Sequence, residues 1–340
     1  MPPQDILAPL SDSAMFVTLT IAPEREAVVH AFLPDLDDLV KSVAFPHPGE
    51  ELHCVLGIGS DAWDRLFTGS RPARLHTFRE IVGGRHTAPS TPGDLFLHLR
   101  STRPYPCFEL ARRVVATLGP AVTVVEAVPG FRYYDRRDLL GFVDGTANPI
   151  GEDAAAAALV ADEDGEFAGG SYLIVQKYLH DLHTWTASPV EAREAAVGRR
   201  MLDNTEIPDA EKAPDSHVAL TTIADPDGTE HEILRDNMPF GSIERGEYGT
   251  FFAGYAADPS ITELMLNRMF IGEPVGCTDR LLEVSTAVTG GLFFAPPRDF
   301  LADPPPLPAA PTTSEAATST LGIGGLRDQG TRSTSPTPAT

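Results

Sequence analysis

Apolar residues along this chain form runs of strand and helix character that follow a similar order in two halves. In the first half, MFVTLTIA predicts a strand, and a helical spacing of apolar residues follows from Val28 to Val43. DLFLHLRS then predicts a second strand, followed by a helix from Phe108 to Leu118 and a strand at AVTVVEAV. The second half offers a strand at SYLIVQKYL, a helix from Val190 to Met201, a strand at GTFFAGYAADPS, a helix from Ile261 to Met269 and a last strand segment at LLEVSTAVTGGLFF.

The two halves also align at a nearly constant spacing. Phe96 aligns with Phe252 at an offset of 156 residues. Ser13 aligns with Ser171 at an offset of 158 residues. Offsets this close favour a duplicated α+β unit with antiparallel sheets of the split βαβ kind. Between the halves, residues 131–170 form a long irregular passage rich in Gly, Asp and Ala, and such passages in compact proteins usually carry function.

The composition changes at about Leu301, where Pro, Ala, Thr and Ser become dominant. Residues 301–340 are predicted to form a disordered tail, because they offer too little apolar surface to offset the entropy of ordering. The folded part is therefore expected to span about residues 10–300.

Charge and sorting signals narrow the possible partners. The chain carries 26 Lys and Arg against 48 Asp and Glu, a formal net charge of -22, which repels both nucleic acid and anionic lipid. The N-terminus has no basic segment followed by an apolar run, and no stretch reaches the roughly 20 apolar residues of a membrane span. We therefore expect a cytoplasmic protein with neither nucleic acid nor membrane as a partner.

Cys54, Cys107 and Cys277 are too scattered for a disulfide framework and are expected to be reduced.

Three segments carry residues suited to chemistry. GFVDGTANP presents Asp144 from a turn flanked by glycines, where a carboxylate can move protons. SHVALTTI places His217 near its start, and imidazole is a common ligand of transition metals. EILRDNMPFG places Arg235 and Asn237 two apart in an extended segment, so that both side chains point to the same side. Taken alone, these segments are also typical of an Asp-Gly turn, a structural histidine and a polar loop. Zinc is disfavoured, because no second His or Cys lies at ligand spacing near His217.

Taken together and in this order, the three segments resemble the dye-decolourising haem peroxidases, specifically the bacterial branch with short loops. GFVDGTANP matches the GxxDG signature of that family, SHVAL matches the segment with the proximal histidine, and LRDNMPFG matches the one with the distal arginine and asparagine. The resemblance runs from about Met15 to Pro297. It implies two tandem ferredoxin-like units of the dimeric α+β barrel type, an N-terminal half over residues 1–150 and a haem-binding half over residues 151–300.

The resemblance also implies a cofactor and a reaction, namely one haem b per chain that reduces hydrogen peroxide and oxidises dyes, phenols or other donors through a ferryl intermediate. Asp144 is suited to relay the proton and Arg235 to stabilise the developing charge. The implied site residues are the iron ligand His217, the catalytic Asp144, Arg235 and Asn237, and the cofactor-contacting Arg235, Gly145 and Thr146. The second ring nitrogen of His217 should bind a carboxylate or carbonyl, with Asp279 and Glu283 as candidates.

The sequence does not identify the reductant, the oligomeric state or the route by which electrons reach the haem. The reductant is a small molecule or a metal ion such as manganese, and the family commonly forms homo-oligomers. Electrons could pass through aromatic side chains, although most aromatics only pack. The candidates for such a relay are Trp63, Trp185, Tyr133, Tyr134 and Tyr178.

The predicted tail contains a short peptide unlike its surroundings, at residues 320–327. Leu321, Ile323 and Leu326 are separated by glycines, and such a peptide can dock apolar anchors into a groove at the end of a long tether. It resembles the targeting peptide of cargo proteins that are loaded into encapsulin nanocompartments. The resemblance implies a location inside such a shell.

Other functions compete with this interpretation. A haem-binding or iron-releasing protein could use the same pocket without peroxidase turnover. The chlorite-converting haem enzymes also pair a proximal histidine with a distal arginine, but their chemistry does not need the carboxylate of Asp144. A structural cargo protein without haem would be a third alternative.

Overall fold

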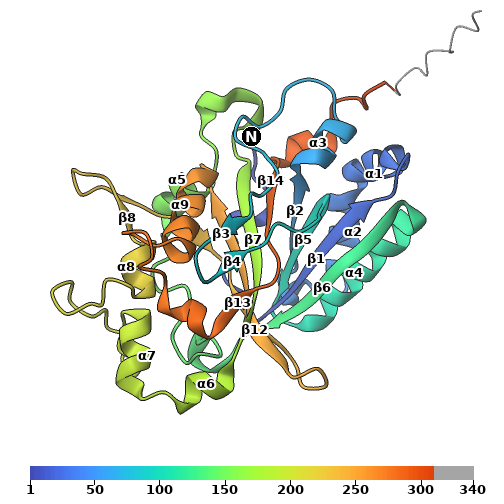
Figure 1. Cartoon of the computed structure of the whole chain (residues 1–340). Coiled ribbons are helices and arrows are strands. Elements are labelled where there is room, and N and C mark those ends of the chain that lie inside the picture. The colour runs from blue at the N-terminus through green and yellow to red at the C-terminus, as the bar shows by residue number, and fades with distance from the viewer. Residues whose placement is uncertain (310–340) are drawn as a thin grey trace, which may run out of the picture. The chain divides into compact units, whose positions relative to one another are not determined.

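One antiparallel sheet of ten strands runs through both halves of the chain that the structure describes (Figure 1). The structure is a computed structural model that describes residues 1–309, apart from the side chains of residues 162–164. The strand order is β10-β12-β7-β14-β2-β5-β1-β6, with β11 also paired to β12 and β13 to β7. The sheet strands are β1 (Ser13–Ile21), β2 (His53–Gly59), β5 (Leu95–Ser101), β6 (Val122–Phe131), β7 (Ser171–His180), β10 (Leu234–Arg235), β11 (Met238–Ser242), β12 (Glu247–Ala256), β13 (Ser285–Ala287) and β14 (Gly291–Ala295). Two small hairpins lie outside it, β3 (Ile81–Val82) with β4 (Thr87–Ala88) and β8 (Ile223–Ala224) with β9 (Glu230–His231).

The sheet curves into a nearly closed barrel, as the α+β prediction required. Strands β6 and β11 belong to different halves of the chain but lie close together. A Cβ at Gly130 of β6 would lie only 2.6 Å from the Cβ of Met238 in β11. Aromatic rings fill the interior, where Phe16 stacks on Phe251 with ring centroids 4.1 Å apart. The boundary predicted at residue 150 stays a prediction, and strands from both sides of it join the same sheet.

The duplication is visible in the strand pairing, but the alignment needs a shift of one residue. Thr18 pairs with Phe96, and Gln176 pairs with Phe252, so the predicted offsets match the pairing register of the two halves. The faces differ, however, because Phe96 points into the barrel whereas Phe252 lines a cavity outside it. The interior counterpart of Phe96 is Phe251, since a shift of one residue moves a strand's side chains to the opposite face.

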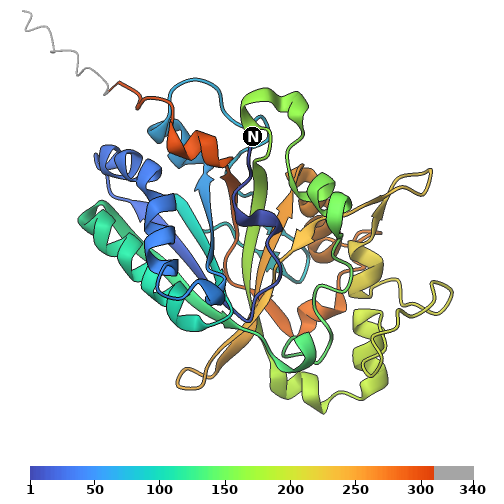
Figure 2. The same cartoon turned by 180° about the vertical axis from the view of Figure 1, so that it is seen from behind.

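Helices cover the outer face of the barrel on its two sides (Figures 1 and 2). The first half contributes α2 and α4, whereas the second half contributes α8 and α9. The helices of the described chain are α1 (Glu26–Phe32), α2 (Leu36–Ala44), α3 (Ser60–Leu66), α4 (Pro104–Leu118), α5 (Gly151–Ala158), α6 (Leu182–Ala187), α7 (Val190–Val197), α8 (His217–Thr221), α9 (Pro259–Phe270) and α10 (Arg298–Ala302).

Some predicted elements differ from the observed ones for local reasons. The helix expected from Val28 to Val43 is broken into α1 and α2 by a 3₁₀ turn that contains Pro34. The helix expected to reach Met201 ends at Val197, because Gly198 adopts a φ of +93° and terminates it. Strand β2 was not predicted, since its sequence HCVLGIG is buried on both faces and shows no alternation.

Two further findings bear on the expectations from composition. Within residues 1–309, no helix is both long and apolar enough to cross a bilayer. Cys54, Cys107 and Cys277 are free, and the first two are buried, so that burial raises the pKa of each of these two thiols to about 12. The predicted targeting peptide at 320–327 lies outside the described residues.

Candidate functional site

A cavity of about 730 Å³ lies on the outer face of the second half, bounded by β7, β12, α8 and α9. The six implied catalytic and cofactor-contacting residues all line this cavity, namely Asp144, Gly145, Thr146, His217, Arg235 and Asn237. Much of the remaining lining is apolar, including Leu140, Phe142, Ile223, Ile233, Phe252, Met265, Leu266, Met269, Leu281 and Leu282. The cavity thus combines an apolar interior with a few polar groups, which is typical of small-molecule and cofactor sites.

His217 is the first residue of α8, whose N-terminus is capped by Ser216 through the backbone N–H of Ala219. Its Nδ1–H donates to Oδ2 of Asp279 at 2.7 Å, and Asp279 is completely buried. Asp279 is itself fixed, because its Oδ1 accepts from the backbone N–H of Leu281 at 2.9 Å. A carboxylate on Nδ1 leaves the lone pair on Nε2, and in the described chain no hydrogen bond occupies that nitrogen. His217 therefore has the orientation of a metal ligand.

The sequence left two carboxylates open as partners of His217, and the structure distinguishes them. Glu283 is partly exposed and forms an ion pair with Arg85 at 2.6 Å. Asp279 is the residue in contact with the imidazole.

His180 also lines the cavity but is not available as a ligand. Its Nε2 contacts the hydroxyl of Thr250 at 3.0 Å, and its Nδ1 contacts the hydroxyl of Ser285 at 2.9 Å. Burial lowers the pKa of His180 to about 4, so the ring is neutral and both nitrogens are occupied.

Asp144 is held in place by its own turn and by Asn237. Gly145 adopts a φ of +74°, which favours glycine, and its backbone N–H donates to Oδ1 of Asp144 at 2.8 Å. The side-chain amide of Asn237 donates to the same oxygen at 3.2 Å, while its Oδ1 accepts from the backbone N–H of Ala253 at 3.3 Å. Because both contacts fall on Oδ1, the other carboxylate oxygen remains open to a proton or a ligand.

Arg235 is a half-buried cation whose guanidinium has no hydrogen-bond partner among the described residues. Asn148 clamps its backbone, since the Asn148 amide donates to the carbonyl of Arg235 at 2.5 Å and accepts from its N–H at 3.1 Å. The guanidinium makes no hydrogen bond within residues 1–309, and its Nε is completely buried. Burial lowers the pKa of Arg235, and the nearby charge of Asp144 opposes this shift. A half-buried cation without a hydrogen-bond partner is suited to receive negative charge from a bound group.

Arg235 and Asn237 share one side because the residue between them points the other way. Asp236 is buried towards the barrel interior, where Arg100 of β5 donates to its Oδ2 at 2.5 Å. This ion pair fixes the segment so that its two neighbours face the cavity, as the alternation of an extended chain predicts.

Asp138 is a further carboxylate in the cavity wall, and sequence reasoning missed it. Burial, followed by the charge of Asp144, raises the pKa of Asp138 to about 7, although the backbone N–H groups of Phe142 and Gly141 favour its ionised form. Two carboxylates, Asp138 and Asp144, thus line one cavity. Asp138 follows two arginines in an irregular passage, and no pattern marks it.

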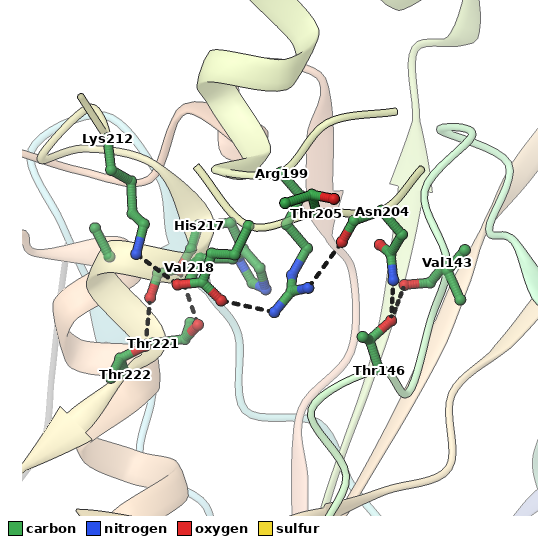
Figure 3. Close-up of polar contacts among 12 residues, drawn as sticks. Val143, Thr146, Arg199, Asn204, Thr205, Lys212, His217, Val218, Thr221 and Thr222 are labelled. Atoms are coloured by element: carbon green, nitrogen blue, oxygen red, sulfur yellow. Dashed lines mark hydrogen bonds and ion pairs between the residues drawn. The ribbon is translucent and has the colours of Figure 1, made fainter. Parts of the chain in front are cut away.

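The segment that follows α7 borders the cavity and forms hydrogen bonds with the turn that contains Thr146 (Figure 3). The side-chain amide of Asn204 donates to the hydroxyl of Thr146 at 2.8 Å. Arg199 donates to Glu206 at 2.7 Å, and Lys212 donates to the other oxygen of Glu206 at 2.5 Å. Both cations line the cavity, and sequence reasoning missed them, because no motif marks either residue.

A second, small pocket of about 40 Å³ meets the main cavity at Asp144, Arg235 and Asn237. Its outer wall includes Arg132, Tyr133, Arg136 and Arg137. Since one water needs a space of about 10–15 Å³, the pocket has room for a very small molecule and none for a dye.

Among residues 1–309, no three His, Cys, Asp or Glu side chains gather in a way that could hold a metal ion. A metal bound to Nε2 of His217 would therefore take its other ligands from a non-protein group.

Comparisons with known proteins agree on one family. The models of the N-terminal and C-terminal parts of Dyp-type peroxidases match residues 3–132 and 135–300. A dye-decolorizing peroxidase of Mycobacterium tuberculosis is 54% identical over 325 residues, which cover 96% of this chain and 97% of the relative. A deferrochelatase of Escherichia coli is 27% identical over 185 residues, which cover 47% of this chain.

Solved structures give the same result. The encapsulated DyP-type peroxidase from Mycobacterium smegmatis superimposes with a TM-score of 0.89 at 54% identity, covering 90% of this chain and 99% of that one. A variant of DypB from Rhodococcus jostii in complex with heme superimposes with a TM-score of 0.86 at 51% identity, covering 88% of this chain and 98% of that one.

Proposed function

The chain belongs to the dye-decolourising peroxidase family, and we propose that its second half binds one haem b, with which it reduces hydrogen peroxide and oxidises dyes, phenols or other electron donors. The contact between His217 and Asp279 carries this proposal. It turns a histidine into an oriented ligand at the wall of a cavity that is also lined by a carboxylate and by an arginine without a hydrogen-bond partner.

The residues present fit a haem. An iron porphyrin supplies four ligands of its own, which suits a site where His217 is the single protein ligand. A largely apolar cavity of about 730 Å³ suits its flat apolar ring. The cofactor's carboxylates need cations, and Arg199 and Lys212 line the same cavity.

When bound, haem would supply the two electrons that reduce hydrogen peroxide. The O–O bond breaks more easily if a proton moves to the departing oxygen while the negative charge on it is stabilised. Asp144 has one open carboxylate oxygen to take and return that proton. The unpaired guanidinium of Arg235 stabilises the charge, and Asn237 holds Asp144 in position.

The small pocket separates the two substrates by size. Its volume of about 40 Å³ admits peroxide to Asp144 and Arg235 but excludes a dye. The donor therefore does not reach Asp144 and Arg235 through this small pocket.

Stopped-flow spectroscopy of the haem-loaded enzyme with peroxide tests these roles. Arg235→Leu should slow the first reaction by about 100- to 1,000-fold, as loss of one charge-stabilising donor typically does, and Asp144→Ala should slow it less. Arg113→Leu, on the surface of α4, is the control and should react at the wild-type rate. An Arg235→Leu enzyme that reacts as fast as the wild type would contradict the assignment.

The same preparation separates a peroxidase from an iron-releasing protein, the function named by the deferrochelatase relatives. A peroxidase oxidises a dye only when peroxide is present and retains its iron. Release of iron-free porphyrin without turnover of the dye would favour the alternative.

We further propose that the chain is packaged in the cytoplasm as encapsulin cargo through Leu321, Ile323 and Leu326. The spacing of these aliphatic residues by glycines supports the proposal, as does the similarity to a peroxidase described as encapsulated. Deleting residues 318–340 should abolish co-purification with a co-expressed shell and leave peroxidase activity intact. Replacing only the three aliphatic residues by Ala should have the same effect, and equal loading of either variant would contradict the proposal.

A further inference from the structure

The barrel interior holds a Tyr–His pair that the site described above does not use. The hydroxyl of Tyr255 on β12 donates to Nδ1 of His98 on β5 at 2.8 Å, and neither side chain has any exposed surface. The ring of Phe16 stacks on His98 with centroids 4.7 Å apart, and further phenylalanines complete the surroundings. The pair is thus a phenol and an imidazole sealed in an aromatic core.

His98 is a neutral base with a carboxylate behind it. Burial lowers the pKa of His98 well below its usual value, and the charge of Arg100 lowers it further. Because Nδ1 accepts from Tyr255, the ring proton is on Nε2, which lies 3.9 Å from Oδ2 of Asp236. An additional proton on His98 would therefore face a negative charge.

We propose that Tyr255 is an internal electron donor of the peroxide-oxidised enzyme and that His98 takes up its proton. The oxidised cofactor gains one electron from Tyr255 while the phenolic O–H bond breaks and an N–H bond forms at Nδ1 of His98. The products are a neutral tyrosyl radical and an imidazolium that faces Asp236. An electron from a reducing substrate restores the phenol, and the proton returns from His98. The inference rests on the proposed peroxidase function, which supplies the oxidant.

The position of Tyr255 supports this role. It pairs with Leu234 across the β10–β12 ladder, next to Arg235 in the cavity wall. Phe252, three residues earlier on the same strand, lines the cavity itself. Tyr255 is therefore separated from the cavity by one layer only, the sheet to which it belongs.

Tyr178 provides an internal comparison. It lines the cavity directly, but its hydroxyl donates to the side-chain carbonyl of Gln176 at 2.7 Å. An amide oxygen is not a base, and burial raises the pKa of both tyrosines, so neither can lose its proton without an acceptor. Tyr178 is the closer donor without a base, whereas Tyr255 has one.

Freeze-quench electron paramagnetic resonance tests the proposal on the full-length, haem-loaded enzyme mixed with hydrogen peroxide in the absence of a reductant. A tyrosyl radical should form in the wild type, and its signal should narrow when the protein is made with ring-deuterated tyrosine. Tyr255→Phe should remove the signal, and Tyr178→Phe should keep it. His98→Gln retains a hydrogen-bond acceptor but not a base, so it should slow radical formation by about 100-fold.

The outcomes separate this proposal from the peroxidase function. A radical that persists in Tyr255→Phe, or one that forms at the wild-type rate in His98→Gln, overturns it. An enzyme that oxidises dyes but forms no tyrosyl radical also overturns it and leaves the peroxidase function intact. A haem spectrum that does not respond to peroxide overturns both. Haem content and far-ultraviolet circular dichroism identify any variant that has failed to fold, and His98→Asn then takes the place of His98→Gln.

Discussion

The two halves of this protein share one architecture, but the helix-covered face of the first half is filled and that of the second is hollow. In the first, Leu110, Val114 and Leu118 of α4 are buried against the outward side chains of β1 and β5. In the second, Met265 and Met269 of α9 border a cavity of about 730 Å³. A packed core and a cofactor site are thus alternative uses of the same face.

The difference comes from the connections between strands rather than from the sheet. Residues 22–52 join β1 to β2 and contain two short helices, α1 and α2. Residues 181–233, between β7 and β10, contain α6, α7 and α8 and include His217, Arg199 and Lys212. The duplicated frame therefore supplies the position of the site, and the longer connection supplies much of its chemistry.

The sharpest way to break this comparison is to remove the ligand from the hollow face. His217→Ala should abolish stable haem binding and peroxidase activity, a larger loss than the 10- to 100-fold that removal of a ligand's partner typically costs a metal site. His47→Ala, an exposed histidine of the first half, is the control and should bind haem normally. The ratio of Soret absorbance to protein measures both. Full haem occupancy in His217→Ala would show that the hollow face does not depend on this ligand.

The sequence predicts the frame of this protein better than it predicts its interior. The strand pairing of the duplicated halves follows from the offsets, because hydrophobic periodicity records which segments are strands. The burial of side chains inside the barrel cannot be predicted from this periodicity. His98 and Arg100 alternate with leucines in DLFLHLRS, which is typical of a strand with one solvent-exposed face. Both are buried, because the barrel closes over that face.

The candidate site shows the same limit. Asp144, His217, Arg235 and Asn237 lie in distinctive segments, and the structure brings all four to one cavity. The choice of Asp279 over Glu283 depends on which side of a 3₁₀ turn faces His217, and spacing alone does not determine that. Asp138 has no motif, since its raised pKa arises from burial by residues distant in sequence.

A smaller change compares how the two faces respond to loss of volume. Leu110→Ala leaves a new void in the filled face and should lower the free energy of unfolding by about 3 kcal/mol. Met265→Ala removes a side chain that already borders a cavity, so we expect a loss of about 1 kcal/mol. Urea unfolding of the haem-free chains measures both. Equal losses would mean that the hollow face is as tightly packed as the filled one.

The support of the ligand can be tested with a matched pair of carboxylates. Asp279→Asn keeps the shape but removes the charge behind His217, and it should weaken haem binding by about 10- to 100-fold. Glu283→Gln changes the other candidate, which pairs with Arg85, and should leave haem affinity unchanged. Titration of the haem-free proteins with haem gives both values. The assignment of Asp279 fails if the two variants bind haem equally.

The effect confined to the narrowest range of conditions is a dependence of stability on pH, which arises from Asp138 on the hollow face. The folded-state pKa of Asp138 is about 7, against an ordinary value of 3.8. Between these values the folded chain holds a proton that the unfolded chain has released, so this stabilisation is complete below about pH 4 and is lost as the pH rises through 7. Relative to the wild type, Asp138→Asn should therefore gain about 1–2 kcal/mol in free energy of unfolding when the pH is raised from 5 to 8. The thiols of Cys54 and Cys107, buried on the filled face, titrate far above this range and contribute nothing to it. Urea unfolding of the haem-free proteins at pH 5, 6, 7 and 8 measures the difference.

Since the charge of Asp144 also raises the pKa of Asp138, the same transition should shift to lower pH in Asp144→Asn. A difference between Asp138→Asn and the wild type that stays constant from pH 5 to 8 would show that Asp138 is ionised throughout.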